Sequence, residues 1–259
     1  MTADLDFAHH LADAADLIST DRFRANDLRV ATKADRTHVT DADQAVERTI
    51  RELIAAEHPG DAIFGEEFGV EGDSNRQWII DPIDGTANYL RGVPLWGTLI
   101  ALAVDGEVVA GVASMPALGG QRWWAAKGAG AWKRSAPGAE PERLHVSSTA
   151  RLDEASVSFQ SIHQWRDAGY LDKLLALVDD VWRDRAYGDL WAYTLLAEGL
   201  IDAVGEFDVK AYDVAPLALL VEEAGGRFTA ATGETGPWHG SALASNGVLH
   251  DELLSRIER

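Results

Sequence analysis

The sequence predicts a layered α/β protein of 259 residues built from two closely packed lobes. Three observations support this fold class. Apolar residues repeat at helical spacing early in the chain, a block of strand-like segments follows, and strands alternate with helices in the second half. A stretch rich in Pro, Gly and Ala over residues 135–142 is typical of a linker. We therefore assign residues 1–134 to the first lobe and residues 143–259 to the second.

The first lobe is predicted to begin with two helices and to continue with strands. Thr40 or Asp41 can cap the second helix, and Pro59-Gly60 can end it. Asp105-Gly106 is typical of a hairpin turn between two strands. Residues 26–40 are polar and irregular, and residues 71–75 predict a loop. The predicted helices cover residues 4–24 and 41–57, and the predicted strands cover residues 62–65, 77–80, 96–104, 107–115, 122–126 and 131–133.

The second lobe is predicted to alternate strands and helices. Asp213 opens an apolar helix that stops at Gly225-Gly226, and Pro216 falls in its first turn, where proline is tolerated. In the first lobe, the pair Trp123-Trp124 is predicted to lie in the core or at an interface. The strands are expected over residues 155–160, 181–186, 203–207 and 227–229, and the helices over residues 170–180, 189–200, 213–224 and 251–257.

Composition and charge exclude several classes of protein. A formal net charge of −19 argues against binding to nucleic acid or to an anionic membrane. The absence of cysteine excludes disulfides and thiolate metal sites. The N-terminal segment is acidic rather than basic, and the longest apolar runs are too short for a membrane span, so we expect a cytoplasmic protein.

The segment WIIDPIDGT over residues 78–86 carries the strongest chemical signal. It predicts a buried strand that ends at two carboxylates, Asp81 and Asp84. Pro82 fixes its own φ and biases Asp81 toward an extended conformation, so both carboxylates and the Ile83 carbonyl can point at one place. Hard oxygen ligands that converge in this way suit Mg²⁺. The alternative is a capped β-turn, because Asp, Pro and Gly all favour turns.

Residues on either side of this segment could serve the same chemistry. Gly85 and Thr86 offer backbone N–H groups to an anion, and the Thr86 hydroxyl could hold an attacking water, although a plain helix start also explains the pair. Glu66 and Glu67 follow an apolar run. We interpret them as metal carboxylates at the end of a neighbouring strand, with a solvated acidic loop as the alternative. A metal beside an anion predicts phosphate chemistry.

Further acidic residues lie at predicted helix starts. Asp213 could ligate a second metal, or could simply cap its helix. Asp41 is best explained as a cap, whereas Asp43 could orient water or hold a weakly bound third metal, and Lys33 lies nearby. A protein this acidic must make a phosphate site locally positive, and bound metal is the simplest means.

Together these segments resemble the inositol-monophosphatase-like family of Mg²⁺-dependent, lithium-sensitive phosphatases, and the similarity spans nearly the whole chain. Two departures from the family pattern are Tyr212, where Trp is usual, and Ala87-Asn88-Tyr89, where Thr-Asn-Phe is commoner. The matching segments are VTDADQAVE at 39–47, GEEFG at 65–69, WIIDPIDGTANYLRGVP at 78–94, YDVAPLALLVEEAGG at 212–226 and ALASNG at 242–247.

The resemblance implies an αβαβα sandwich of the inositol monophosphatase and fructose-1,6-bisphosphatase type, and a homodimer. It also implies two or three Mg²⁺ ions per active site, for which Mn²⁺ could substitute. Glu66 and Thr86 would orient the attacking water, and Asp84 would be a third catalytic residue. The implied metal ligands are Glu66, Asp81, the Ile83 carbonyl, Asp84 and Asp213.

The resemblance also implies a substrate site around these ligands. Its expected residues are Asp81, Ile83, Asp84, Gly85, Thr86, Arg185, Asp189, Glu206 and Asp213, with Lys33 and Asp43 as possible supporting residues. Within that site the backbone amides of Gly85 and Thr86 would bind phosphate oxygens. Residues 185–190 would form one wall, and Glu206 lies where the family has a substrate-contacting carboxylate.

Within the family, three segments resemble the actinobacterial type of histidinol-phosphatase: residues 76–102, 122–132 and 181–193. L-Histidinol phosphate is therefore the predicted substrate, and a cationic amine suits a pocket containing Asp189 and Glu206. The alternatives are an inositol-1-monophosphatase, or a broader phosphatase acting on fructose bisphosphate or a nucleotide 3′-phosphate. The third hypothesis is a non-catalytic protein-binding role, and the presence of all the expected metal carboxylates argues against it.

Overall fold

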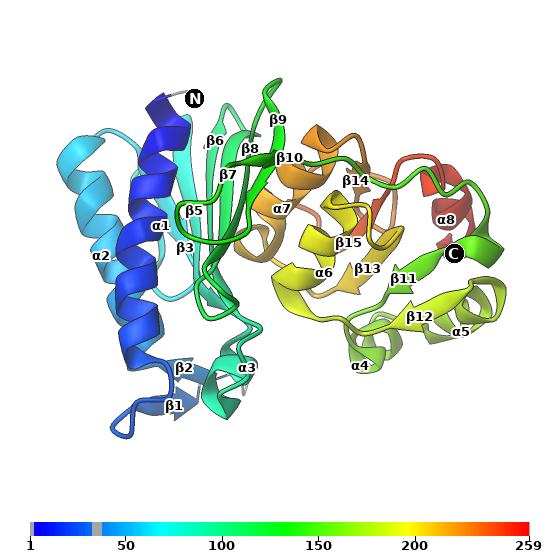
Figure 1. Ribbon diagram of the computed structural model, residues 1–259, viewed down its shortest axis with the longest axis horizontal. Coiled ribbons are helices and arrows are strands. Elements are labelled where there is room, and N and C mark those ends of the chain that lie inside the picture. Colours follow the sequence, from blue (N-terminus) through cyan, green and yellow to red (C-terminus); the bar gives the residue numbers. More distant parts are fainter. Residues whose placement is uncertain (1–2, 33–37, 259) are drawn as a thin grey trace.

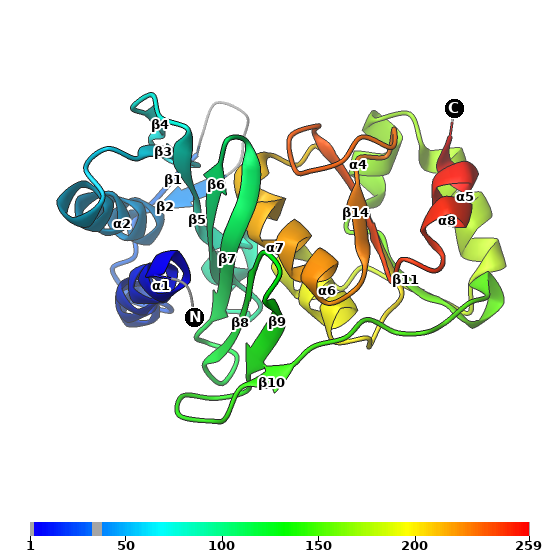
Figure 2. The same ribbon diagram turned by 90° about the horizontal axis from the view of Figure 1, so that it is seen from above.

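Five layers, alternately helical and β-sheet, make up the computed structural model, which describes residues 3–32 and 38–258 (Figure 1). Helices α1 (Ala3–Arg22) and α2 (Asp41–Glu57) form the first layer. An eight-stranded sheet follows, then α6 (Asp189–Ala197) and α7 (Ala211–Glu223), then a five-stranded sheet. The last layer holds α4 (Ile162–Asp167), α5 (Leu171–Asp180) and α8 (His250–Ile257) (Figure 2). The predicted αβαβα layering is confirmed.

The larger sheet has the strand order β10-β9-β8-β7-β6-β5-β3-β4 and is antiparallel except where β3 pairs with β5. Its strands are β3 (Ala62–Gly65), β4 (Gly69–Glu71), β5 (Arg76–Asp84), β6 (Gly97–Val104), β7 (Glu107–Met115), β8 (Gln121–Ala126), β9 (Gly130–Arg134) and β10 (Glu142–Arg143). The short helix α3 (Thr86–Arg91) follows β5 directly. The carboxyl ends of the parallel pair β3 and β5 therefore lie side by side, which is where the acidic residues cluster.

The smaller sheet has the order β12-β11-β13-β15-β14 and mixes parallel with antiparallel pairs. Its strands are β11 (Ser156–Ser158), β12 (Arg183–Arg185), β13 (Ala203–Phe207), β14 (Arg227–Thr229) and β15 (Ser241–Ser245). Helix α7 packs against strands of both sheets, so one apolar core joins the lobes. Trp123 and Trp124 are buried, as predicted. None of the helices among the described residues combines the length and apolarity needed to cross a bilayer.

Several predicted elements need correction. Residues 26–40 contain a two-stranded ribbon, β1 (Val30–Thr32) and β2 (His38–Thr40), which lacks the apolar alternation that would reveal it. Strand β10 extends the larger sheet past the predicted linker. Asp213 is the third residue of α7 rather than its first, and Pro216 lies inside the helix rather than in its first turn. The short helix α4 and the strands β4 and β15 were not predicted, and α3 was anticipated only as a helix start at Gly85-Thr86.

Gly111 on β7 marks the contact between the larger sheet and α7. A Cβ atom at this position would lie 2.9 Å from the Cα and 3.0 Å from the Cβ of Pro216. We expect Gly111→Ala to lower the free energy of unfolding by about 1–3 kcal/mol, the usual effect of overpacking. Urea unfolding measures this, with Gly60→Ala as control, since nothing lies within 4 Å of a Cβ there. Equal losses in the two variants would contradict the close packing.

Candidate metal centre

Strand β5 ends in a β-bulge that presents two aspartates. Asp81 pairs with Leu99 and Asp84 with Gly97, so three steps on β5 face two on β6. Pro82 has no N–H to donate and sits within this irregularity, as proline in a sheet usually does. Its carbonyl accepts from the Thr98 hydroxyl at 2.8 Å, and the Asp81 carboxylate accepts from the Ile83 N–H at 3.1 Å. These bonds fix the backbone that carries both carboxylates.

Asp213 joins the two strand-end aspartates from the first turn of α7. One of its oxygens accepts from the Lys210 N–H at 2.6 Å, which orients the carboxylate at the helix start. Asp81, Asp84 and Asp213 each offer an oxygen within 4.8 Å of the others. The structure thus brings together residues separated by about half of the chain.

Glu66 follows β3 and lies beside this cluster. Its N–H donates to the Ile80 carbonyl at 3.1 Å, which continues the parallel pairing of β3 with β5. Its charge raises the pKa of both Asp81 and Asp213. Glu66 lies outside the group of three that meets within 4.8 Å. The pairing of β3 with β5 confirms that Glu66 follows a strand next to the one that carries Asp81, whereas its role as a metal ligand stays a prediction.

Burial and like charge govern the electrostatics of the cluster. Burial, followed by Glu66, Asp84 and Asp213, raises the pKa of Asp81 well above its ordinary value. Burial and then Asp189 raise the pKa of Asp84. Burial likewise raises the pKa of Asp213 to about 7. Asp81 is buried and Asp84 and Asp213 are half-buried, and carboxylates this close together need a cation or protons to neutralise them. Oxygen donors of this kind fit a hard divalent cation.

Thr86 and Asp43 connect the cluster to α2. The Thr86 hydroxyl lies 3.0 Å from the Ile83 carbonyl and 3.3 Å from an Asp43 oxygen. The other Asp43 oxygen accepts from the N–H and the hydroxyl of Thr40, the N-cap of α2. Burial raises the pKa of Asp43 to about 6. Gly85 has a φ of +80° and starts α3, so its backbone turns sharply beside Asp84.

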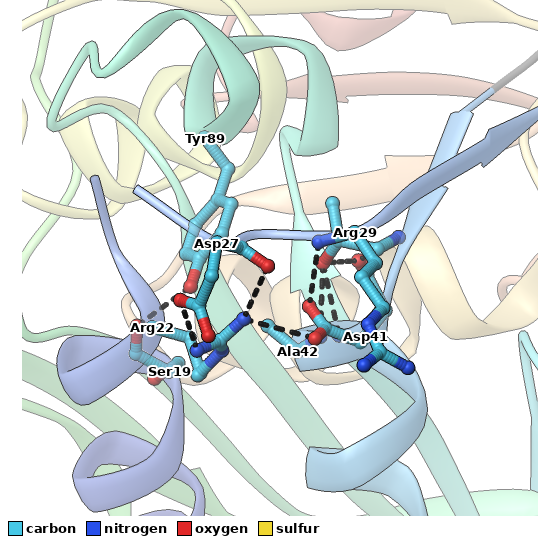
Figure 3. Close-up of polar contacts among 9 residues, drawn as sticks. Ser19, Arg22, Asp27, Arg29, Asp41, Ala42 and Tyr89 are labelled. Carbon is cyan, nitrogen blue, oxygen red and sulfur yellow. Dashed lines mark hydrogen bonds and ion pairs between the residues drawn. The ribbon is translucent and has the colours of Figure 1, made fainter. Parts of the chain in front are cut away.

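Asp41 belongs to a separate structural network rather than to the cluster. Arg22 donates to Asp41 and to Asp27, and the Arg29 N–H donates to Asp41 (Figure 3). The Tyr89 hydroxyl donates to the Ser19 carbonyl at 2.8 Å, which fastens α3 to α1 (Figure 3). Thr40, not Asp41, is the N-cap of α2. Lys33 lies outside the described residues.

Two carboxylates of the second lobe adjoin the cluster. The Asp189 carboxylate accepts from Asn88 at 2.8 Å and from Gln160 at 3.0 Å, while its N–H donates back to Gln160. Glu206 is buried, accepts from the Tyr193 hydroxyl at 2.8 Å, and has its pKa raised by burial to about 8. Both carboxylates influence the pKa of Asp84.

A cavity of about 420 Å³ opens beside Asp189. It is lined by Asn88, Leu95, Gln160, Ser161, Gln164, Ala186, Tyr187, Gly188 and Asp189. Residues 186–189 thus form one wall of this cavity, and the role of the segment 185–190 as a substrate wall stays a prediction. Arg185 does not line this cavity, and its exposed side chain contacts the neighbouring Asp184 carbonyl.

The sequence analysis missed three features that build the centre. The Leu190 N–H donates to Asp84 at 2.6 Å and so ties α6 to the end of β5. Asn88 and Gln160 hold Asp189, which has a φ of +49°. Glu47 is completely buried and binds the loop that carries Glu66. A carboxylate on the apolar face of a predicted helix was the available signal for Glu47.

Residues 2–259 match the model of the inositol monophosphatase family. Over 255 residues the chain is 52% identical to a histidinol-phosphatase of Mycobacterium tuberculosis, covering 98% of this chain and 97% of that protein. Over 261 residues it is 50% identical to a histidinol-phosphatase of Streptomyces coelicolor, covering 99% and 97%.

The fold also matches solved structures over its full length. An inositol monophosphatase from Zymomonas mobilis superposes with a TM-score of 0.85 at 31% identity, covering 100% of both chains. An IMPase from Thermotoga maritima superposes with a TM-score of 0.86 at 28% identity, covering 99% of this chain and 97% of that one.

Proposed function

The chain belongs to the inositol monophosphatase family and is a phosphoric monoester hydrolase, and we propose that it hydrolyses L-histidinol phosphate to L-histidinol and phosphate. The observation that carries the hydrolase assignment is the meeting of Asp81, Asp84 and Asp213 within 4.8 Å. The observation that favours histidinol phosphate is the identity of at least 50% to two histidinol-phosphatases over nearly the whole chain.

We propose Mg²⁺ as the cation of this centre. Asp81, Asp84, Asp213, Glu66 and the Ile83 carbonyl would hold two or three ions, with Mn²⁺ able to substitute. When bound, divalent ions polarise phosphoryl oxygens and make water a nucleophile at neutral pH. The buried carboxylates of the centre, whose pKa values are raised, support this assignment because they lack sufficient compensating charge.

The protein groups around the centre have distinct tasks in this proposal. Glu66 and the Thr86 hydroxyl orient the attacking water, and the Thr86 hydroxyl is already held between Ile83 and Asp43. The backbone N–H groups of Gly85 and Thr86 bind phosphate oxygens. No covalent enzyme intermediate is required.

The cavity beside Asp189 is the proposed site for the organic part of the substrate. Asn88 and Gln160 hold the Asp189 carboxylate through neutral amides, so its negative charge is not cancelled by them. Glu206 is buried nearby, and its pKa of about 8 means that it ionises at neutral pH only when a cation lies close to it. Histidinol phosphate carries an ammonium group and an imidazole, which the negative charge of Asp189 attracts, whereas a neutral polyol offers no positive charge.

We expect Asp189→Asn to lower kcat/KM for histidinol phosphate by about 10- to 100-fold and to change the value for inositol 1-phosphate much less. Asparagine keeps the acceptor for Asn88 and tolerates the positive φ at this position. Steady-state kinetics on both substrates with Mg²⁺ measure the difference. The exposed Asp167→Asn on α4 removes a carboxylate outside the cavity and serves as the matched control.

Steady-state kinetics of the wild-type enzyme on a panel of phosphate esters test the proposed substrate. Wild-type enzyme should prefer histidinol phosphate to inositol 1-phosphate, fructose bisphosphate and a nucleotide 3′-phosphate. Preference for inositol 1-phosphate would replace our assignment with the inositol-1-monophosphatase alternative. The homodimer and the cytoplasmic location implied by the sequence stay predictions, and sedimentation of the purified protein tests the first.

A further inference from the structure

Glu47 is a completely buried carboxylate on α2 that the proposed chemistry does not use. Its Oε2 accepts from the Glu67 N–H at 2.7 Å, and its Oε1 accepts from the Phe68 N–H at 3.2 Å. Arg51, one turn later, donates from Nε to the same Oε1 at 2.8 Å. Consecutive backbone N–H groups form a natural anion site, and here the anion is an internal side chain.

Gly65 lets this carboxylate approach the end of β3. A Cβ atom at residue 65 would lie 1.9 Å from Glu47 Oε1 and 2.3 Å from its carboxyl carbon. The backbone of Gly65 does not have a positive φ, so the requirement for glycine here is one of space. The strand end and the carboxylate are therefore packed directly against each other.

The contact between Gly65 and Glu47 matters for the aspartate cluster because residues 64–66 connect α2 on one side of the sheet with α7 on the other. Successive residues of a strand point to opposite faces. Gly65 faces Glu47 and α2, whereas the Phe64 ring packs against Tyr212 of α7 with centroids 5.4 Å apart. Glu66 is the first residue after β3, and its charge acts on both Asp81 and Asp213, so it lies near the start of α7.

Arg51 closes the far side of the same loop. Its guanidinium binds the Gly69 carbonyl at 2.5 Å and Glu71 at 3.0 Å, on strand β4. Its side chain is only 11% exposed, and it offsets the buried charge of Glu47. Glu47 and Arg51 thus hold the backbone of residues 65–71 from both ends of the turn.

We propose that Glu47 is a positioning residue: by binding the Glu67 and Phe68 N–H groups, it presents the Glu66 carboxylate to the divalent-cation centre. This inference rests on the proposed metal centre. When the loop is released from Glu47, the turn after Glu66 can take up more conformations, and the entropy lost on ordering it again weakens metal binding. Partners outside the ligand set typically change metal affinity or activity by 10- to 100-fold.

The first test is Glu47→Gln in the full-length protein. Glutamine has the same shape, but one acceptor oxygen is replaced by an NH₂ group that faces a backbone N–H. We expect the dissociation constant for Mn²⁺, measured by calorimetry on metal-free protein, to rise about 10- to 100-fold. Hydrogen exchange of the Glu67 and Phe68 amides should accelerate, and kcat should fall at limiting Mg²⁺ with little change in KM for substrate. Glu52→Gln, exposed on the same helix, should change none of these.

A second variant keeps the charges of Glu47 and Arg51 and tests the contact between Gly65 and the Glu47 carboxylate. Gly65→Ala displaces the Glu47 carboxylate and should weaken Mn²⁺ binding as Glu47→Gln does. In the double variant Glu47→Ala/Gly65→Ala the clash is gone, so its affinity should equal that of Glu47→Ala rather than the sum of both losses.

The outcomes separate this inference from the proposed function. If wild-type protein binds no divalent cation, the metal centre itself is wrong. If wild-type protein binds Mn²⁺ and Glu47→Gln binds it equally well, only the positioning role is overturned. A lower melting temperature with unchanged Mn²⁺ affinity would likewise assign Glu47 to fold stability alone and overturn the inference.

Discussion

Asp84→Asn is expected to reduce kcat/KM at least about 10³-fold, which corresponds to about 4 kcal/mol of transition-state stabilisation. The amide cannot supply the negative charge that holds a divalent cation, but its oxygen can still accept from the Leu190 N–H. The variant also removes one like charge from the buried cluster. We therefore expect the metal-free variant to melt at a higher temperature than metal-free wild type at pH 8, although it is inactive.

This pairing of lost activity with gained stability distinguishes a metal-site effect from misfolding. Asp208→Asn is the matched control, because that carboxylate is 81% exposed and Asn favours the positive φ found there. The control should retain activity and show little change in melting temperature. Full activity in Asp84→Asn would remove the proposed metal centre.

The metal-free protein is expected to lose stability as the pH rises from 6.5 to 8.5, and Mg²⁺ is expected to suppress much of that loss. Burial raises the pKa of Asp213 to about 7 and that of Glu206 to about 8, and burial also raises the pKa values of Asp81 and Asp84 well above their ordinary value. The folded state therefore binds more protons than the unfolded state in this range. Under that condition the free energy of unfolding falls with increasing pH, by up to about 1.4 kcal/mol per group and pH unit.

The choice of pH range isolates the carboxylates. Burial lowers the pKa of His9 and of His250 to about 4, so these groups stabilise the protein as the pH rises toward 6.5 and act in the opposite sense. In the unfolded state, with the ordinary pKa of about 6.5, both histidines are still half protonated at pH 6.5 and become almost fully neutral only above about pH 7.5, so the range from pH 7.5 to 8.5 reports on the carboxylates. We expect the melting temperature of the metal-free protein to fall by roughly 5–10 °C over this range, because each kcal/mol lost from the free energy of unfolding lowers the melting temperature by about 2–4 °C in a protein of this size. Calorimetry with and without Mg²⁺ measures it, and equal pH slopes would contradict cation binding at the cluster.

The local elements of the site were predictable because their signals are local. Asp81 and Asp84 end a strand whose apolar run and proline can be read directly, and Asp213 lies in the first turn of a helix with clear apolar periodicity. The short elements were not predictable. Strands β1 and β2 have three residues each, and α4 has six, so each is too short to show a period.

The supporting contacts were not predictable for a different reason. Gln160 holds Asp189 across 29 residues, and the Leu190 N–H reaches Asp84 across 106 residues. Nothing in the neighbourhood of either residue specifies its partner. The place of Glu47 on the apolar face of α2 signals burial, but nothing in the sequence shows that its partners are the Glu67 and Phe68 N–H groups.

The sequence by itself determined that Asp81 and Asp84 end a strand, that Asp213 lies near a helix start, and to which family the chain is related, and it predicted these residues as oxygen donors. Only the tertiary structure decided that α7 brings Asp213 to the end of β5, that Glu47 lies against Gly65, and that Asp189 faces a cavity. The physical reason is that periodicity and turn chemistry act over a few residues. The meeting of distant carboxylates depends instead on how α7 packs between two sheets, where contacts such as Gly111 against Pro216 set the distance.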